Sequence, residues 1–131
     1  MSQPDRDDPR HLLFVYGTLK TGFCRNPYLQ GQQFVGPVRT TSTYRLVDCG
    51  HFPGLIVDLN HGISIGGELW RVNDHCLQEL DRVEDVAGGL YRRGQITLKN
   101  CSDPEAMTYF YNRETRSFPD CGDCWTAGQT Q

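Results

Sequence analysis

A succession of short segments rich in β-branched and aromatic residues, separated by turns that contain glycine or proline, constrains this chain more than any other feature. The segments are residues 12–16, 34–50, 54–59, 63–72, 90–100 and 106–112. The 34–50 segment is long enough for two strands with a bend at Gly36-Pro37, and the last two segments alternate apolar and polar residues as a hairpin does. Gly66-Gly67 marks a bulge or a close backbone approach. The pattern predicts a strand-rich domain.

One segment is helical. Asn73 is a good N-cap, Asp74 stabilises the first turn, and the pattern continues to about Val86 before an Ala-Gly-Gly sequence ends it. The apolar stripe of this helix consists of Cys76, Leu77, Leu80, Val83 and Ala87. Together with the strands, the helix predicts an α+β fold.

The length of 131 residues suits one domain with a hydrophobic core. Residues 1–11 are polar and form a flexible N-terminal arm in this interpretation, so that the domain covers residues 12–131. The arm lacks the apolar segment of a signal peptide, and no apolar stretch reaches the roughly 20 residues that span a bilayer. A net charge of −3 without a basic patch argues against nucleic acid as a partner. We therefore expect a cytoplasmic protein that contacts neither membrane nor nucleic acid.

Six cysteines raise the question of disulfides or a metal site. Four of them are scattered along the chain, and only Cys121 and Cys124 form a CxxC pair, which lies near the end of the sequence. A zinc site would need two more ligands at matching spacing, and no second pair exists. We expect six reduced thiols and no metal.

Glu84 is the residue that the helical pattern leaves unexplained. It follows Leu80 by four residues and therefore points along the apolar stripe. Burial, the negative end of the helix dipole and the neighbouring Asp81 would all raise its pKa, which suits a general base. Arg92 or Arg93 could offset this by pairing with it. The alternative is a carboxylate at the rim of the stripe that only forms such a pair.

The first strand ends abruptly in the sequence Tyr16-Gly17-Thr18-Leu19. Successive backbone N–H groups after a strand can bind an anion, although an ordinary turn explains the tetrapeptide equally well. The GxxxxGK[ST] pattern of nucleotide phosphate loops is absent, so a small carboxylate is the better ligand. An anion site and an inward base, without a nucleophile, suggest chemistry in which the substrate supplies its own nucleophile.

Five short motifs occur in one order along the chain: FVYGTLKTG, HFPGLI, GGELWRV, LDRVEDVAGGLYRR and GDCW. Together, over about residues 12–125, they resemble the gamma-glutamylcyclotransferase-like family, in particular its gamma-glutamylamine cyclotransferase branch. The resemblance implies a mixed, barrel-like sheet with a few flanking helices. It also implies a cofactor-independent enzyme that releases 5-oxoproline from a small γ-glutamyl amine or γ-glutamyl amino acid. Either a monomer or a homodimer is compatible with it.

The resemblance also implies roles for individual residues. The loop of residues 16–19 holds the γ-glutamyl group, Glu84 is the general base, and Tyr91 and Trp125 form walls of the pocket. The alternative is a non-catalytic module that binds a small γ-glutamyl or acidic metabolite, because a fold can outlive its chemistry. The presence of a carboxylate at position 84 favours the enzyme.

Overall fold

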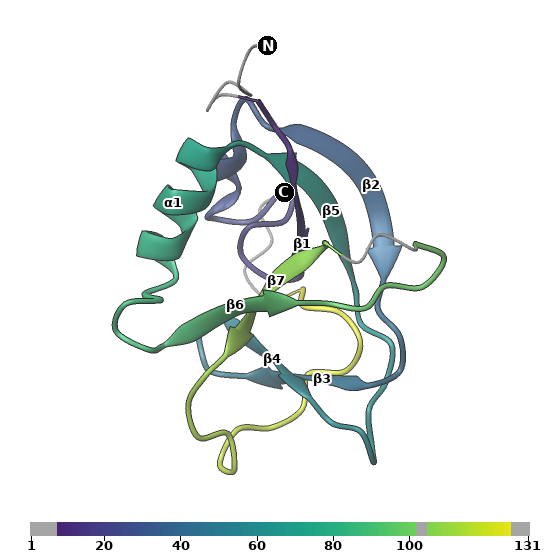
Figure 1. Ribbon diagram of the computed structural model, residues 1–131. Helices are drawn as coiled ribbons and strands as arrows, with labels where there is room; N and C mark the ends of the chain where they lie inside the picture. Colours follow the sequence, from purple (N-terminus) through teal and green to yellow (C-terminus); the bar gives the residue numbers. More distant parts are fainter. Residues whose placement is uncertain (1–7, 102–104, 127–131) are drawn as a thin grey trace.

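Every expected strand region contributes to one sheet in the computed structural model, which describes residues 8–101 and 105–126. The strands and helices, shown in Figure 1, are β1 (His11–Val15), the 3₁₀ helix η1 (Asn26–Leu29), β2 (Gln33–Arg39), β3 (Tyr44–Asp48), β4 (Pro53–Val57), β5 (Gly66–Val72), α1 (Asp74–Val83), β6 (Tyr91–Gln95) and β7 (Met107–Tyr111). The fold is the α+β arrangement that the sequence predicts, with a single α-helix and one 3₁₀ helix in the described ranges.

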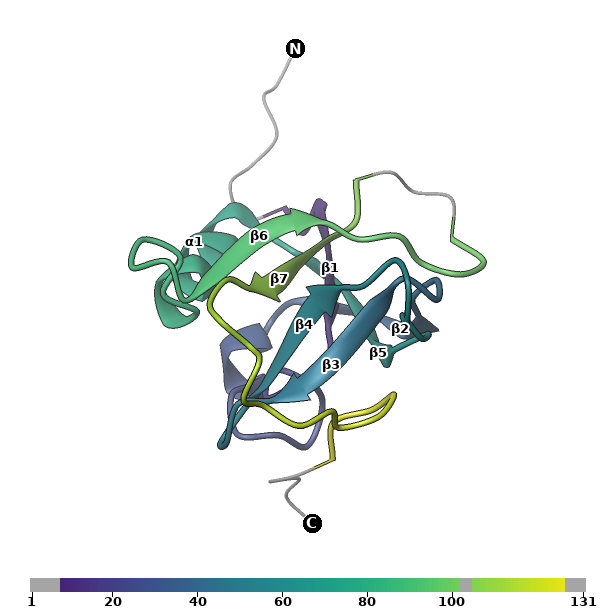
Figure 2. The same ribbon diagram turned by 90° about the horizontal axis from the view of Figure 1, so that it is seen from below.

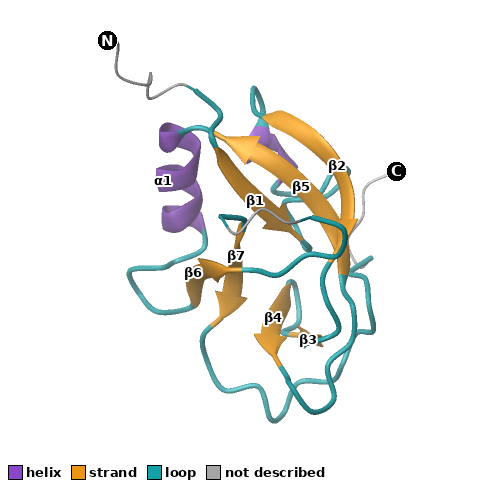
Figure 3. Cartoon of the chain, turned by 45° about the vertical axis from the view of Figure 1, so that its right-hand side comes forward, coloured by secondary structure: helices purple, strands orange, loops and turns teal. Residues whose placement is uncertain are grey.

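The sheet is mixed and has the strand order β2-β5-β1-β7-β4-β3, with β6 as an additional partner of β7. Neighbouring strands are antiparallel except where β7 meets β1 and β4, which it pairs in parallel. The 34–50 segment forms two strands, and the expected bend appears as an irregularity between Phe34 and Gly36 in β2. Figure 3 shows β1, β5 and β2 side by side.

The sheet forks at β7. One edge of β7 pairs with β6 along its whole length, whereas the other edge meets β1 at Met107 and β4 at Phe110. The side chain of Tyr16, just after β1, fills this fork. Its hydroxyl donates to the carbonyl oxygen of Tyr109 at 2.5 Å and accepts from the amide of Leu55 at 3.2 Å. Tyr16 thus replaces the ladder hydrogen bonds that the diverging strands cannot make.

The far edge of the sheet curls back toward β6. Thr40, after β2, forms a bridge with Leu98, after β6. The amide of Thr41 donates to the carbonyl oxygen of Thr97 at 3.0 Å, and the amide of Lys99 donates to that of Arg39 at 2.8 Å. These bonds give the sheet the barrel-like form that the family resemblance implies.

Both faces of β1 are covered, which explains its continuous apolar sequence. Leu12, Phe14 and Tyr16 belong to the core cluster inside the curled sheet. Leu13 and Val15 face the opposite way and pack in the cluster that includes the buried stripe of α1. The strand therefore positions the following loop between two packed layers.

Helix α1 begins as predicted and ends earlier than predicted. The Asn73 side chain accepts a hydrogen bond from the amide of Cys76 at 2.7 Å, which confirms the N-cap. The helix ends at Val83 rather than near Val86, because Asp85 adopts a left-handed backbone conformation with φ of 54°. Ala87 consequently lies outside the helix and is exposed, so its placement in the apolar stripe was wrong.

The segment after β7 returns across the molecule and lies beside the β3–β4 pair (Figure 2). The amide of Cys121 donates to the carbonyl oxygen of Leu46 at 3.0 Å, and the amide of Gly66 donates to that of Asp123 at 2.8 Å. All six cysteines are unpaired. Within the described ranges, no helix is long and apolar enough to cross a membrane.

Candidate active site

A pocket lies where β1 ends, at the fork of the sheet. Its walls come from the end of β1, the following loop, the start of β4, the residue after α1 and the starts or middles of β6 and β7. Six of the seven residues that the sequence assigned to the site line it: Tyr16, Gly17, Thr18, Leu19, Glu84 and Tyr91. Segments far apart in sequence thus meet at one place.

In the loop after β1, the carbonyl groups are hydrogen-bonded, whereas the amide groups of residues 17–19 are not. The carbonyl oxygens of Gly17, Thr18 and Leu19 accept hydrogen bonds from the Lys20 amide, the Arg25 amide and the Asn26 side chain at 3.1, 2.8 and 2.9 Å. No hydrogen bond within the described part of the chain uses the N–H groups of residues 17–19. These three N–H groups therefore have no partner in the described part of the fold.

Gly17 is required for the close approach of this loop to β4. A Cβ at position 17 would lie 2.6 Å from Cγ of Pro53, which is closer than such atoms pack. The loop and Pro53 both line the pocket, so this contact sets its width.

Glu84 lies directly after the last residue of α1 with 6% of its surface exposed. Burial raises the pKa of its carboxyl group from 4.5 to about 7, and the nearby Arg25 opposes the rise. Arg25 Nη1 lies 3.7 Å from Glu84 Oε2, too far for a good hydrogen bond. In the described residues, no hydrogen bond reaches this carboxylate. The expected inward carboxylate is present.

The alternative in which Glu84 only pairs with Arg92 or Arg93 is wrong, because both arginines have other partners. Arg93 pairs with Asp81 at 2.9 Å, and the guanidinium of Arg92 stacks over the ring of Phe110. Asp81 also accepts a hydrogen bond from the hydroxyl of Tyr109 at 2.7 Å. Burial is the main cause of the rise in the pKa of Glu84.

The two predicted tyrosines contribute rings rather than free hydroxyl groups. The Tyr16 hydroxyl bridges the fork, and the Tyr91 hydroxyl donates to the carbonyl oxygen of Pro53 at 2.6 Å. Burial, assisted by the charge of Glu84, raises the pKa of both phenols far above the ordinary value of 10.0. Neither phenol is therefore suited to accept or release protons near neutral pH.

Trp125 does not line the pocket, which corrects the expectation that it forms a wall. Its side chain is buried in the cluster inside the curled sheet, and its carbonyl oxygen accepts a hydrogen bond from Lys20 Nζ at 2.7 Å. It acts on the site indirectly, because Lys20 follows the pocket loop. The tail thereby holds the loop in place.

Sequence reasoning missed Arg25, Phe52, Pro53 and Tyr109, which also line the pocket. Arg25 lies in a loop without a periodic pattern, so nothing in the sequence indicates its direction. Tyr109 lies in an alternating strand, and its neighbours Thr108 and Phe110 belong to the opposite face. The alternation could have indicated which face Tyr109 shares, but not that this face reaches the pocket.

The arrangement can bind an anion and move a proton. A buried carboxylate that titrates near pH 7 can accept a proton from a bound ammonium group. None of the described lining residues is a serine or a cysteine, and no group of three His, Cys, Asp or Glu side chains in the described ranges could hold a metal ion.

Comparison with known proteins identifies the family of this chain. Residues 13–127 match the family described as gamma-glutamyl cyclotransferase, AIG2-like. A Vibrio cholerae protein that carries the provisional name gamma-glutamylcyclotransferase is 39% identical over 116 residues, which is 87% of this chain and 95% of the relative. The gamma-L-glutamyl-butirosin B gamma-glutamyl cyclotransferase of Niallia circulans is 28% identical, over 78% of this chain and 67% of that enzyme.

The fold of this chain is also similar to solved structures. A uropathogenic Escherichia coli-specific protein superposes with a TM-score of 0.74 at 27% identity, covering 85% of this chain and 87% of that protein. The family match extends over nearly all of the domain, from β1 to the tail residue Trp125 and beyond. This chain therefore belongs to the AIG2-like gamma-glutamyl cyclotransferase family.

Proposed function

We propose that this protein is a cofactor-independent gamma-glutamylcyclotransferase that converts a γ-glutamyl amine or γ-glutamyl amino acid into 5-oxoproline and the free amine or amino acid. Glu84 removes a proton from the α-ammonium group of the substrate. The freed amine attacks the γ-carbonyl carbon, the five-membered lactam closes, and the bond to the leaving nitrogen breaks. As that bond breaks, the proton on Glu84 passes to the leaving nitrogen. The regenerated carboxylate takes the second proton from the ring nitrogen, and this proton ends on the released amine, which departs as its ammonium form.

The observation that carries this proposal is the environment of Glu84. Its carboxylate is buried in the pocket, receives no hydrogen bond from the described residues and has a pKa near 7. A structural carboxylate at such a depth normally receives hydrogen bonds, whereas Glu84 has only the 3.7 Å approach of Arg25, and a poorly satisfied buried charge is costly. A base whose pKa lies close to the working pH is instead the most effective proton acceptor and donor.

The loop of residues 17–19 provides binding and orientation. Its three unused N–H groups suit the α-carboxylate of the glutamyl group, which carries the negative charge that fixed amide dipoles favour. Holding that carboxylate in the loop would fold the glutamyl chain so that its amine lies near its own γ-carbonyl. Such near-attack positioning is a large share of the rate enhancement in intramolecular reactions.

The test is incubation with a panel of γ-glutamyl amines and γ-glutamyl amino acids, with mass spectrometry for 5-oxoproline and the released amine. We expect both products in equal amounts from at least one member. The matched controls are the α-linked isomers, which have the same mass but cannot close the five-membered ring with release of the amine.

A second candidate function, a binding module without turnover, keeps the same pocket. It would show itself as saturable binding of γ-glutamyl compounds with no 5-oxoproline, even at high protein concentration and long times. That result would contradict the proposed reaction.

A further inference from the structure

Arg25 introduces a positive charge into a pocket that the proposed reaction uses for a glutamyl group. It is the one cationic side chain among the described residues that line the pocket. Its side chain is 36% exposed, whereas that of Glu84 is 8% exposed, so Arg25 lies at the mouth and Glu84 inside. The guanidinium makes no hydrogen bond within the described residues, and its one ion pair is the 3.7 Å approach to Glu84.

The backbone of Arg25 is fixed although its side chain is not. Its amide donates to the carbonyl oxygen of Thr18 at 2.8 Å, and its own carbonyl oxygen accepts from the amide of Tyr28 at 3.0 Å. The first bond joins Arg25 directly to the loop that presents the unused N–H groups. The backbone that carries the guanidinium is therefore held at a constant place relative to that loop, and the donors of the side chain are available to a ligand.

We propose that Arg25 binds the carboxylate of the leaving amino acid, so that the enzyme favours γ-glutamyl amino acids over γ-glutamyl amines. This inference rests on the proposed function. The leaving nitrogen must come within about 3 Å of Glu84 to receive its proton. In an α-amino acid the carboxylate is attached one carbon from that nitrogen. A guanidinium 3.7 Å from Glu84 is therefore within reach of it.

Electrostatics support the same assignment. A second carboxylate next to the buried Glu84 would be repelled unless a cation lies between or beside them, and Arg25 is that cation. A leaving group with a positive charge would be repelled by the guanidinium. An alkyl amine has no charge with which the guanidinium could interact favourably. The three loop donors remain for the glutamyl carboxylate, so each of the two substrate carboxylates has its own partner.

The decisive pair of substrates is γ-glutamyl-alanine and γ-glutamyl-ethylamine, which differ only in the carboxylate of the leaving group. We expect the wild-type protein to prefer γ-glutamyl-alanine by about ten- to a hundredfold in kcat/KM, as charge-assisted hydrogen bonds typically contribute. Arg25→Gln should bring this ratio close to one, mainly through a higher KM for γ-glutamyl-alanine. Arg25→Lys should retain part of the preference because it keeps the charge.

The readout is the ratio of kcat/KM for γ-glutamyl-alanine to that for γ-glutamyl-ethylamine. Any change in the basicity of Glu84 affects both values equally and cancels in this ratio. The matched control is Arg116→Gln, whose side chain is 91% exposed and pairs only with Glu114 among the described residues. It should leave the ratio unchanged. Thermal unfolding of each variant verifies that it is folded.

The outcomes separate the two proposals. If Arg25→Gln releases 5-oxoproline with the wild-type ratio, or lowers kcat/KM equally for both substrates, the role of Arg25 is overturned and the proposed reaction stands. If the wild-type protein turns over γ-glutamyl-ethylamine as well as γ-glutamyl-alanine, the role is likewise overturned. If it turns over no γ-glutamyl compound at all, both proposals fall.

Discussion

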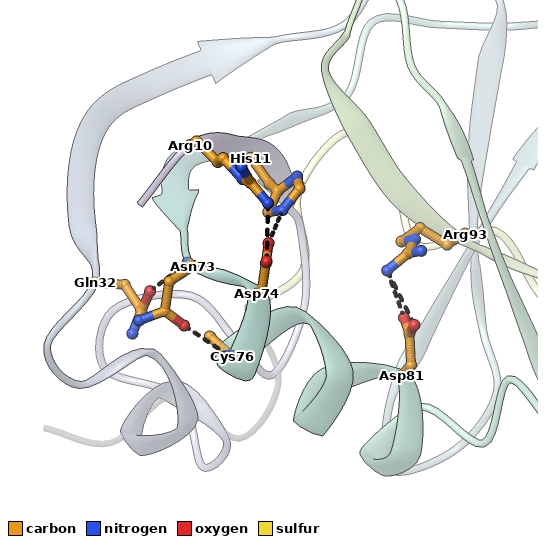
Figure 4. Close-up of polar contacts among 8 residues, drawn as sticks. All are labelled: Arg10, His11, Gln32, Asn73, Asp74, Cys76, Asp81 and Arg93. Carbon is orange, nitrogen blue, oxygen red and sulfur yellow. Dashed lines mark hydrogen bonds and ion pairs between the residues drawn. The ribbon is translucent and has the colours of Figure 1, made fainter. Parts of the chain in front are cut away.

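The carboxylates at the two ends of helix α1 have opposite surroundings: Asp74 is well paired, and Glu84 is buried with few contacts. At the N-terminal end, Asp74 accepts hydrogen bonds from Arg10 at 2.8 Å and contacts His11 at 2.5 Å, and Asn73 caps the helix (Figure 4). The contact with His11, with help from Arg10, lowers the pKa of Asp74. Asp74 and Asn73 at this end both have hydrogen-bond partners.

At the C-terminal end, Glu84 is deeper than Asp74 and has only the distant charge of Arg25. Burial therefore raises the pKa of Glu84, whereas pairing lowers that of Asp74. Asp74 stabilises the fold above the ordinary pKa of aspartate, and this contribution is lost as the pH falls through its lowered value. Glu84 lowers stability as the pH rises from 4.5 to about 7. One end of the helix anchors the chain, and the other holds a reactive group at the expense of stability.

The largest expected effect comes from Glu84→Gln, which removes the base and keeps its shape. Turnover should fall at least about 100-fold, because glutamine cannot accept the ammonium proton. The free energy of unfolding at pH 8 should be unchanged or higher by up to about 3 kcal/mol, since the folded protein no longer holds a buried charge. Steady-state kinetics and urea unfolding measure the two quantities.

Binding of 5-oxoproline should survive in this variant, because the loop of residues 17–19 rather than the base holds the product. Calorimetry of the variant with 5-oxoproline provides the control. A Glu84→Gln protein that is fully active, or one that unfolds, would make Glu84 a structural residue like Asp74.

The pH dependence of kcat/KM is the next test of the contrast. Activity of the wild-type protein should fall about tenfold per pH unit below a midpoint near pH 7, because the protonated form of Glu84 is not a base. The profile is measured with the best substrate of the panel between pH 5 and 9. A midpoint near pH 4.5 would mean that burial does not raise the pKa of Glu84 above that of an ordinary exposed carboxylate.

Asn73→Ala should affect the other end of the helix and spare the chemistry. Loss of the hydrogen bond to the amide of Cys76 should lower the free energy of unfolding by about 1 kcal/mol. Gln78→Ala, in the exposed middle of the same helix, is the control and should leave it unchanged or raise it slightly. Turnover at a temperature where both are folded should equal that of the wild type. A marked loss of turnover in Asn73→Ala would show that the two ends are not independent.

The contrast also separates what the sequence can predict from what it cannot. The inward direction of Glu84 and the cap at Asn73 depend on helical periodicity and local hydrogen bonding, which a sequence displays directly. The helix end at Val83 was harder to predict. The apolar pattern continues through Val86, but the left-handed conformation of Asp85 ends the helix. Local pattern indicates the type of element better than its last residue.

Contacts between distant segments are the part of the site that the sequence predicts least well. Arg25 lies in an irregular loop, and its approach to Glu84 depends on how that loop folds over the end of β1. The three partners of β7 are similarly hidden, since an alternating strand displays its faces but not its neighbours along each edge. The family motifs mark the six predicted residues that line the pocket, but a motif does not show which of its side chains face the pocket: Phe52 and Pro53 lie in one motif and were missed.

The smallest effect is expected from Asp81→Asn, which changes a carboxylate three residues from Glu84. The asparagine can still accept the hydrogen bond from the Tyr109 hydroxyl, so the pocket wall should keep its place. The charge pair with Arg93 is partly exposed, and such pairs contribute about 0–1 kcal/mol. Turnover should therefore stay within about threefold of the wild type, measured under the conditions used for Glu84→Gln.

Asp85→Asn is the companion variant, because asparagine also tolerates the left-handed conformation of that exposed position. It should change turnover no more than Asp81→Asn does. A loss in either variant as large as that of Glu84→Gln would mean that the acidic segment acts as a unit. Loss in Glu84→Gln alone would mean that the depth of one side chain, rather than the negative charge of the segment, provides the base. The C-terminal end of α1 would then differ from its N-terminal end because its carboxylate, Glu84, is buried without a hydrogen-bond partner among the described residues.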